Sequence, residues 1–97
     1  MAPASRSPNN GWFVYMLLCR GGRIYTGITP DVRQRYARHR AGKGGAFTRS
    51  FPPLRVLAAM PCASRGEALK LEYALKQRDP AGKRRWARQW RWRSPKG

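Results

Sequence analysis

The apolar run from Trp12 to Cys19 constrains the fold of this chain more than any other feature of the sequence. It has the length of a β-strand and is rich in aromatic and branched residues. Arg20-Gly21-Gly22 follows it, and a second short apolar run occupies residues 23–28. Because glycine supplies the positive φ that tight hairpin turns require, the two runs predict an antiparallel hairpin.

The next segment carries the signals of a helix start. Thr29-Pro30-Asp31 offers a capping hydroxyl, a proline at the first helical position and an acid in the first turn. We therefore expect a helix over residues 30–41 that stops at Gly42. Residues 42–53 contain several glycines and prolines and predict a loop, and the apolar residues 54–60 predict a third strand.

Two further helices are expected downstream. Ser64 and Glu67 form a capping-box pattern, which predicts a helix ending near Arg78. Asp79-Pro80 then starts a third helix that continues through Arg88 or beyond. The order β-β-α-β-α-α predicts the α/β class, with a small three-stranded antiparallel sheet flanked by helices.

The length and the net charge of the chain limit the number of domains and the kinds of partner that it can have. Its 97 residues suffice for one domain, which we place at residues 11–90, between a flexible lead (1–10) and a basic tail (91–97). The 21 Lys and Arg against 4 Asp and Glu give a net charge of +17, which favours nucleic acid as partner. An anionic membrane is the competing polyanion, and a ribosome-associated structural protein stays open on composition.

Other features point to the cytoplasm. No apolar run reaches the roughly 18 residues of a membrane span, and the first ten residues lack the apolar stretch of a signal peptide. Cys19 and Cys62 are too few and too far apart for a disulfide framework, so we expect buried thiols.

One of the four acids has no evident structural use. Asp31, Glu67 and Asp79 stand at helix starts, whereas Glu72 does not. It shares one face of the expected helix, at i, i+3, i+4 and i+7, with Ala68, Leu71 and Leu75. The sequence leaves two interpretations equally open: a functional carboxylate, or a boundary residue that pairs with Lys76.

The preceding helix shows the same kind of stripe. Val32, Arg35, Tyr36 and His39 have the same spacing, which places a guanidinium and an imidazole beside apolar residues. Both side chains could instead extend off the rim of the stripe, and a lone histidine is more often structural than functional.

The hairpin contributes two phenols, Tyr15 and Tyr25. Facing strands could bring them together, although core packing is the more common use of a strand tyrosine. Gly27 stands inside the second strand, where a glycine often marks a close approach of backbone or ligand.

These residues resemble the GIY-YIG nuclease family. Phe13-Val14-Tyr15 and Tyr25-Thr26-Gly27 are similar to the paired tripeptides that name it, with the first two letters of the first triplet replaced. Residues 31–39 resemble the family's helix with its active-site arginine, and Glu72 matches the glutamate that holds the metal. Residues 42–49 are similar to the loop of its compact, stand-alone bacterial subgroup of uncharacterised nuclease-like proteins. The resemblance covers residues 11–83.

The resemblance implies an endonuclease that hydrolyses phosphodiester bonds with one Mg²⁺ or Mn²⁺ held by Glu72, and it favours DNA over RNA. Arg35 would neutralise charge on the phosphoryl oxygens. Tyr25 would be the general base, Tyr15 would orient it, and His39 is the rival base. No small-molecule cofactor is implied. The alternative is a non-catalytic nucleic-acid-binding protein with the same fold.

Further contacts to nucleic acid are expected from the loop and the C-terminal segment. Lys43, Thr48 and Arg49 belong to the loop that the resemblance places beside the site. Of the C-terminal tryptophans, we expect Trp86 and Trp90 to be core anchors rather than stacking platforms, and Trp92 to be exposed.

Overall fold

The predicted hairpin forms two strands of a three-stranded antiparallel sheet, with its first strand in the centre. The computed structural model describes residues 11–93, with strands β1 (Trp12–Cys19), β2 (Arg23–Thr29) and β3 (Pro53–Cys62) in the order β2-β1-β3. A short 3₁₀ turn, η1 (Arg20–Gly22), joins β1 to β2, and Gly21 and Gly22 have φ of 81° and 77°. The predicted hairpin and the predicted α/β class are confirmed.

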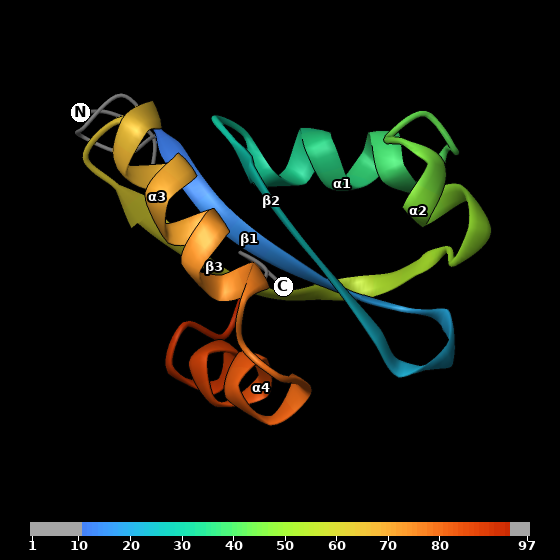
Figure 1. Ribbon diagram of the computed structural model, residues 1–97. Helices are drawn as coiled ribbons and strands as arrows, with labels where there is room; N and C mark the ends of the chain where they lie inside the picture. The colour runs from blue at the N-terminus through green and yellow to red at the C-terminus, as the bar shows by residue number, and fades with distance from the viewer. Residues whose placement is uncertain (1–10, 94–97) are drawn as a thin grey trace.

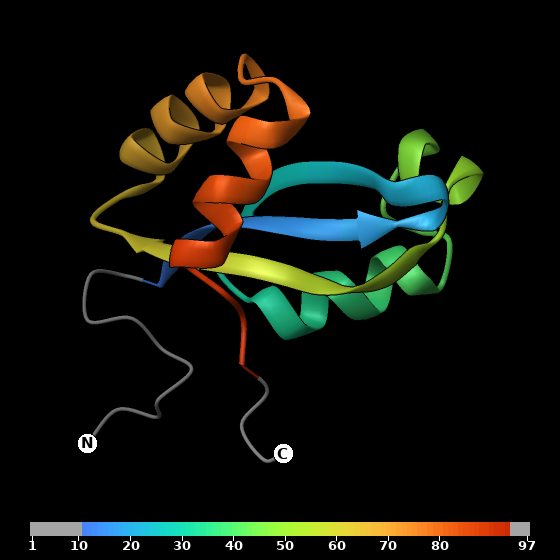
Figure 2. The same ribbon diagram turned by 90° about the horizontal axis from the view of Figure 1, so that it is seen from below.

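Helices cover both faces of the sheet. They are α1 (Val32–Arg40), α2 (Ala46–Ser50), α3 (Arg65–Lys76) and α4 (Pro80–Gln89). Figure 2 shows α3 and α4 on one face and α1 on the other. Alternate residues of β1 feed two cores: Val14 and Met16 pack with α3 and α4, whereas Tyr15 and Leu17 pack with α1.

The first helix starts two residues later than its sequence signals predicted. Asp31 is the N-cap: its backbone is extended, and its carboxylate accepts a hydrogen bond from the Gln34 N–H at 3.0 Å. The Thr29 hydroxyl accepts from the Asp31 N–H at 3.1 Å instead of capping the helix. The prediction of Pro30 as first helical residue was therefore wrong, because the aspartate is the better placed cap.

The caps of the later helices are as predicted. The Ser64 hydroxyl accepts from the Glu67 N–H at 3.1 Å, and Glu67 accepts from the Ala63 N–H at 3.3 Å. Asp79 accepts from the Gly82 N–H at 2.8 Å, with Pro80 at the first helical position. In α3, Ala68 and Leu75 are buried and Leu71 and Glu72 half-buried, so the predicted stripe is present.

The segment predicted as a loop contains a helical turn. Residues 46–50 form α2 between Gly45 and Phe51, and β3 begins at Pro53. The Phe47 and Phe51 rings pack with centroids 5.4 Å apart. The glycines marked the irregular backbone correctly, but they could not show that the residues after Gly45 form a packed turn.

The residues that follow α4 pair with β3. The Ala59 N–H donates to the Trp90 carbonyl at 3.0 Å, and the Trp92 N–H donates to the Leu57 carbonyl at 3.1 Å. The expectations for two tryptophans were reversed: Trp90 is 37% exposed, whereas Trp92 is half-buried against the α1-side core. The strand-like pairing with β3 turns Trp92 inward. The expected lead (1–10) and residues 94–97 of the expected tail lie outside the described residues.

Two smaller expectations concern cysteines and membranes. Cys19 and Cys62 are free and buried, as expected. Within residues 11–93, every helix is too short or too polar to cross a bilayer.

Candidate functional site

Two tyrosines and a histidine meet on the α1 face of the sheet. The strand register places Tyr15 opposite Gly27 and Leu17 opposite Tyr25, so the side chains of Tyr15 and Tyr25 emerge on the same face. The Tyr15 hydroxyl is 2.9 Å from His39 Nε2, and the Tyr25 and His39 ring centroids are 4.9 Å apart. Local strand pairing and one turn of α1 thus assemble this cluster.

Both ring nitrogens of His39 are engaged. Nδ1 is 2.7 Å from the Thr48 hydroxyl, and His39 is only 1% exposed. Thr48 is itself buried, so its predicted contact with nucleic acid was wrong: α2 turns it inward to hold the imidazole. The sequence carried no signal for this role, because a threonine in a glycine-flanked segment is ordinarily exposed.

Two glycines make room for the cluster. A Cβ on Gly27 would lie 2.8 Å from the Tyr15 hydroxyl oxygen and 3.0 Å from its Cζ. A Cβ on Gly44 would overlap the His39 imidazole outright. Gly27 was predicted to mark a close approach, and the group approaching it is the Tyr15 ring of the neighbouring strand.

Substituting Gly44 should therefore destabilise the protein and displace His39. Overpacking costs typically about 1–3 kcal/mol, and Gly44→Ala is expected to lower the free energy of unfolding by about 3 kcal/mol. Urea denaturation measures this change. Gly66→Ala is the matched control: the new Cβ would have the Ser64 hydroxyl as its neighbour, 3.7 Å away, on an exposed helical surface. It should raise stability by about 0.5–1 kcal/mol. A Gly44→Ala variant as stable as the parent would contradict the observed packing.

Burial keeps two groups of the cluster neutral. It raises the pKa of the Tyr15 phenol, Tyr25 raises it further, and the nearby Arg35 guanidinium opposes the shift. Burial lowers the pKa of His39 below its ordinary value, and Arg35 and Arg38 lower it further. At neutral pH the Tyr15 phenol is thus protonated and the imidazole uncharged, a combination in which Tyr15 can donate a hydrogen bond to Nε2.

This shift predicts a pH dependence of stability. The unfolded chain binds a proton at its one histidine below the ordinary pKa, while the folded protein resists protonation. The free energy of unfolding should therefore fall as the pH is lowered from about 7 to about 5. Urea midpoints across this interval measure the effect, and a His39→Gln variant should lose this slope. Stability that rises on acidification would contradict the pKa direction.

Arg35 belongs to the predicted stripe of α1. Val32 and His39 are buried, and Arg35 and Tyr36 are half-buried between them. Arg35 stands one turn before His39 on α1, and its charge acts on the pKa of both Tyr15 and His39. Lys43 and Arg49 are exposed, just before and within α2. Phe47, which sequence analysis did not single out, is 38% exposed and packs its ring 5.7 Å from that of Tyr25.

Glu72 does not join the cluster directly. It lies on α3, whose apolar residues pack on the other face of the sheet. Its carboxylate pairs with Lys76 at 3.2 Å, and its side chain is 19% exposed. Figure 1 shows α1 and α3 on either side of β2, the edge strand. These groups do not share one face of the sheet, because α1 and α3 pack on opposite sides of it. A site that uses Glu72 and the tyrosines must straddle β2.

The acidic side chains fit a metal ion held by one protein ligand and by water better than a metal ion surrounded by protein ligands. Asp31 and Asp79 cap helices and Glu67 bonds the start of α3, which leaves Glu72 as the carboxylate free of a backbone role. Within residues 11–93, no three His, Cys, Asp or Glu side chains cluster as metal ligands. The Thr26 hydroxyl, on the β2 face that α3 covers, is buried without a hydrogen-bond partner. One carboxylate fits Mg²⁺, which keeps several waters and binds substrate phosphate.

The paired tyrosine motifs, the arginine of α1 and the glutamate of α3 define a class of small catalytic domains. Residues 11–85 match the family model described as the GIY-YIG catalytic domain, and the chain belongs to this family. Its curated relatives carry a more particular name. The UPF0213 protein of Cupriavidus pinatubonensis is 54% identical over 72 residues, which are 74% of this chain and 80% of the relative. The UPF0213 protein of Cupriavidus necator is 43% identical over 83 residues, covering 86% of this chain and 90% of the relative.

A solved structure supports the same grouping. The solution NMR structure of the UPF0213 protein BH0048 from Bacillus halodurans superposes with a TM-score of 0.52 at 36% identity. The match covers 80% of this chain and 83% of that chain. The sequence resemblance to a compact subgroup of the family is thereby confirmed.

Proposed function

We propose that this protein is a metal-dependent endonuclease that hydrolyses phosphodiester bonds in nucleic acid, with DNA favoured over RNA. One observation carries the proposal: Tyr15, Tyr25 and His39 meet beside Arg35 within a GIY-YIG catalytic domain. The net charge of +17 supplies the attraction for a polyanionic substrate.

The burial of the three rings assigns their proposed roles. Tyr25 is the half-buried member, so its hydroxyl is the group we assign to activating the attacking water. Tyr15 is buried and protonated, so it can donate to His39 Nε2, and the other ring nitrogen lies 2.7 Å from the Thr48 hydroxyl. In this scheme the buried pair fixes the position of the Tyr25 ring, which packs on His39.

Arg35 is the proposed electrophilic group. A guanidinium presents a fork of donors that matches two phosphate oxygens, and it stays charged throughout the reaction. Its place on the α1 stripe beside the phenols would put it next to a phosphate that faces Tyr25. There it would stabilise the negative charge that develops on the non-bridging oxygens.

Glu72 is the proposed metal ligand, approaching from the α3 side of β2. A bound Mg²⁺ or Mn²⁺ would supply Lewis-acid polarisation of the phosphate and stabilisation of the leaving oxygen. Because β2 is the edge strand, side chains of both α1 and α3 could reach a substrate that lies along this edge. The Glu72–Lys76 ion pair is partly exposed, so its net contribution to stability is small and Glu72 can exchange partners at little cost.

A second function is favoured by the same position of Glu72. If the Glu72 carboxylate only pairs with Lys76 on the α3 face, the tyrosine cluster on the other face has no metal ligand and would not catalyse cleavage. The protein would then be a nucleic-acid-binding module that shares the nuclease fold.

Cleavage assays with and without metal separate the two functions. The purified protein is incubated with branched, single-stranded and duplex DNA and with RNA, each in Mg²⁺, Mn²⁺ or EDTA. The nuclease predicts cut products in Mg²⁺ or Mn²⁺ and none in EDTA. Binding without products under every condition would favour the non-catalytic module.

Lys43 is the proposed phosphate contact next to α2. Lys43→Ala should lower affinity across sequences and reduce the slope of log affinity against log salt by roughly one unit. Fluorescence anisotropy over a salt series measures both quantities. Lys70→Ala, on the exposed surface of α3, removes the same charge away from the cluster and should leave the slope nearly unchanged. An unaltered slope in Lys43→Ala would remove this contact from the proposed interface.

A further inference from the structure

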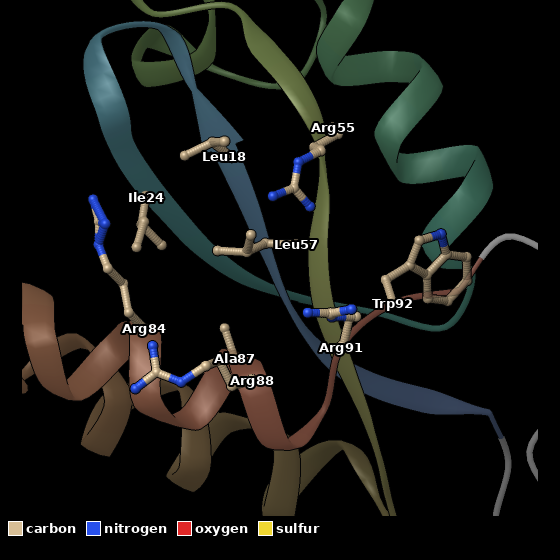
Figure 3. A pocket seen from close by; sticks show the side chains of 9 residues that line it. All are labelled: Leu18, Ile24, Arg55, Leu57, Arg84, Ala87, Arg88, Arg91 and Trp92. Carbon is tan, nitrogen blue, oxygen red and sulfur yellow. The ribbon is translucent and has the colours of Figure 1, made fainter.

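A pocket on the face opposite the tyrosine cluster has a chemistry that the proposed active site does not use. It has a volume of about 470 Å³ and lies between α4 and the half of the sheet that is next to the β1–β2 turn. Four arginines surround it, as Figure 3 shows: Arg55 on β3, Arg84 and Arg88 on α4, and Arg91 just beyond α4.

The charge in this pocket has no acidic counterpart. All four acids of the chain lie in the described part and are engaged elsewhere, three at helix starts and Glu72 with Lys76. Arg84 donates to the Gly22 carbonyl at 3.3 Å, which ties it to the turn and leaves it charged. Four uncompensated guanidinium groups around one hollow repel each other, and a polyanion relieves that repulsion.

The floor of the pocket is apolar. Leu18, Ile24 and Leu57 point into it from the three strands, and Trp92, whose ring packs toward α1, borders the pocket at the β3 side. Such an apolar floor can take up a flat, weakly polar group such as a base. The pocket therefore combines phosphate recognition at its rim with base-sized apolar contact at its base.

We propose that this pocket binds a second nucleic-acid segment, distinct from the one presented to the tyrosine cluster. The arginines hold consecutive phosphates, and one base rests on the apolar floor formed by Leu18, Ile24 and Leu57. Arginine suits both tasks, because its fork pairs with phosphate oxygens and its plane stacks on bases. An anionic protein surface would match the charge of the rim but would leave the apolar floor without a matching group.

The pocket has an extension that lengthens the binding track. A smaller pocket of about 330 Å³ shares Ile24 and Arg84 with it and adds Arg23 and Lys83. This second hollow reaches Phe47, whose ring packs against Tyr25. Cationic and aromatic side chains thus continue from the arginine pocket around the hairpin end of β2 to the cluster on the other face.

Matched arginine variants on α4 test the proposal. Arg88 lines the pocket, whereas Arg85 on the same helix is exposed and does not. Affinity for a short fluorescent oligonucleotide is measured in EDTA, where cleavage does not interfere. Arg88→Gln should weaken binding about tenfold at 0.1 M salt and reduce the salt slope by about 0.9, and Arg85→Gln should change both much less. Arg55→Gln, from β3, should reproduce the Arg88 effect, and thermal unfolding confirms that each variant is folded.

Changes in the NMR chemical shifts of the backbone amides then show where the oligonucleotide binds. On titration of the oligonucleotide, residues such as Leu57 and Ala87 should shift in the parent protein and much less in the Arg88→Gln variant. Equal effects of the Arg85 and Arg88 changes, or shifts confined to α1 and β2, would overturn the proposal. Inorganic tripolyphosphate that competes as well as the oligonucleotide, phosphate for phosphate, would overturn the assignment of a base to the apolar floor. Because the readout is binding, its failure is independent of whether the protein cleaves.

Discussion

Replacing Glu72 with glutamine is expected to abolish metal-dependent cleavage while nucleic-acid binding persists or strengthens. The change removes the one carboxylate without a backbone role and keeps the shape of the side chain. A carboxylate near a phosphate is repulsive unless a cation lies between them, so its loss should not weaken binding. Single-turnover cleavage in Mg²⁺ or Mn²⁺ measures the first effect, and anisotropy in EDTA measures the second.

The control for Glu72→Gln is Glu67→Gln on the same helix. Glu67 bonds the start of α3, so its replacement removes one charge but no metal ligand. Cleavage by Glu67→Gln should stay within about twofold of the parent, since a surface change typically costs under about 0.5 kcal/mol. Loss of cleavage and binding together in Glu72→Gln, with a lower unfolding free energy, would mean that Glu72 serves the fold alone. Full cleavage by Glu72→Gln would remove this residue from the mechanism.

Replacing Tyr25 with phenylalanine should lower the cleavage rate about a thousandfold, within the range of general-base contributions. The ring remains, so its packing on His39, with centroids 4.9 Å apart, and on Phe47 should hold the cluster together. Only the hydroxyl that would activate water is lost. The cleavage rate and the affinity of the variant are measured separately, because affinity should change little.

The control for Tyr25→Phe is Tyr73→Phe, whose ring is 70% exposed on α3. This change removes a hydroxyl remote from the cluster and should leave the rate unaltered. A Tyr25→Phe variant that cleaves at the parental rate would remove the Tyr25 hydroxyl from the mechanism and leave His39 as the rival base to be tested. In that case the rate should rise with pH through the depressed pKa of His39, and His39→Gln should lose the activity.

Local sequence patterns predicted the structure correctly where the contacts that determine it join residues close in sequence. The Gly21-Gly22 turn and the apolar run before it specified the hairpin, and the spacing of Ala68, Leu71, Glu72 and Leu75 specified the face that α3 buries. The start of α1 was misplaced because three neighbouring residues compete for the cap, and only backbone geometry shows that Asp31 takes it.

The assembly of the site depended on contacts between distant residues. The sequence indicated that the hairpin could bring Tyr15 and Tyr25 together, and the strand register, which pairs Leu17 with Tyr25, puts them on the same face. The hydrogen bond from His39 to Thr48 could not be predicted, since it depends on how α2 folds back over α1. The role of Gly44 could not be predicted either. It is an ordinary loop glycine in the sequence, and in the structure its missing side chain leaves room for the His39 imidazole.

The sequence by itself thus determined the class of fold, the three strands, the helices α1, α3 and α4, the family motifs and the cationic character of the molecule. Each of these follows from side-chain periodicity, turn chemistry or composition, which are properties of short segments. The tertiary structure alone decided that Glu72 and the tyrosines lie on opposite faces and that four arginines ring a pocket under α4. Which face of the sheet a helix covers depends on the path of the whole chain, and no local pattern encodes that path.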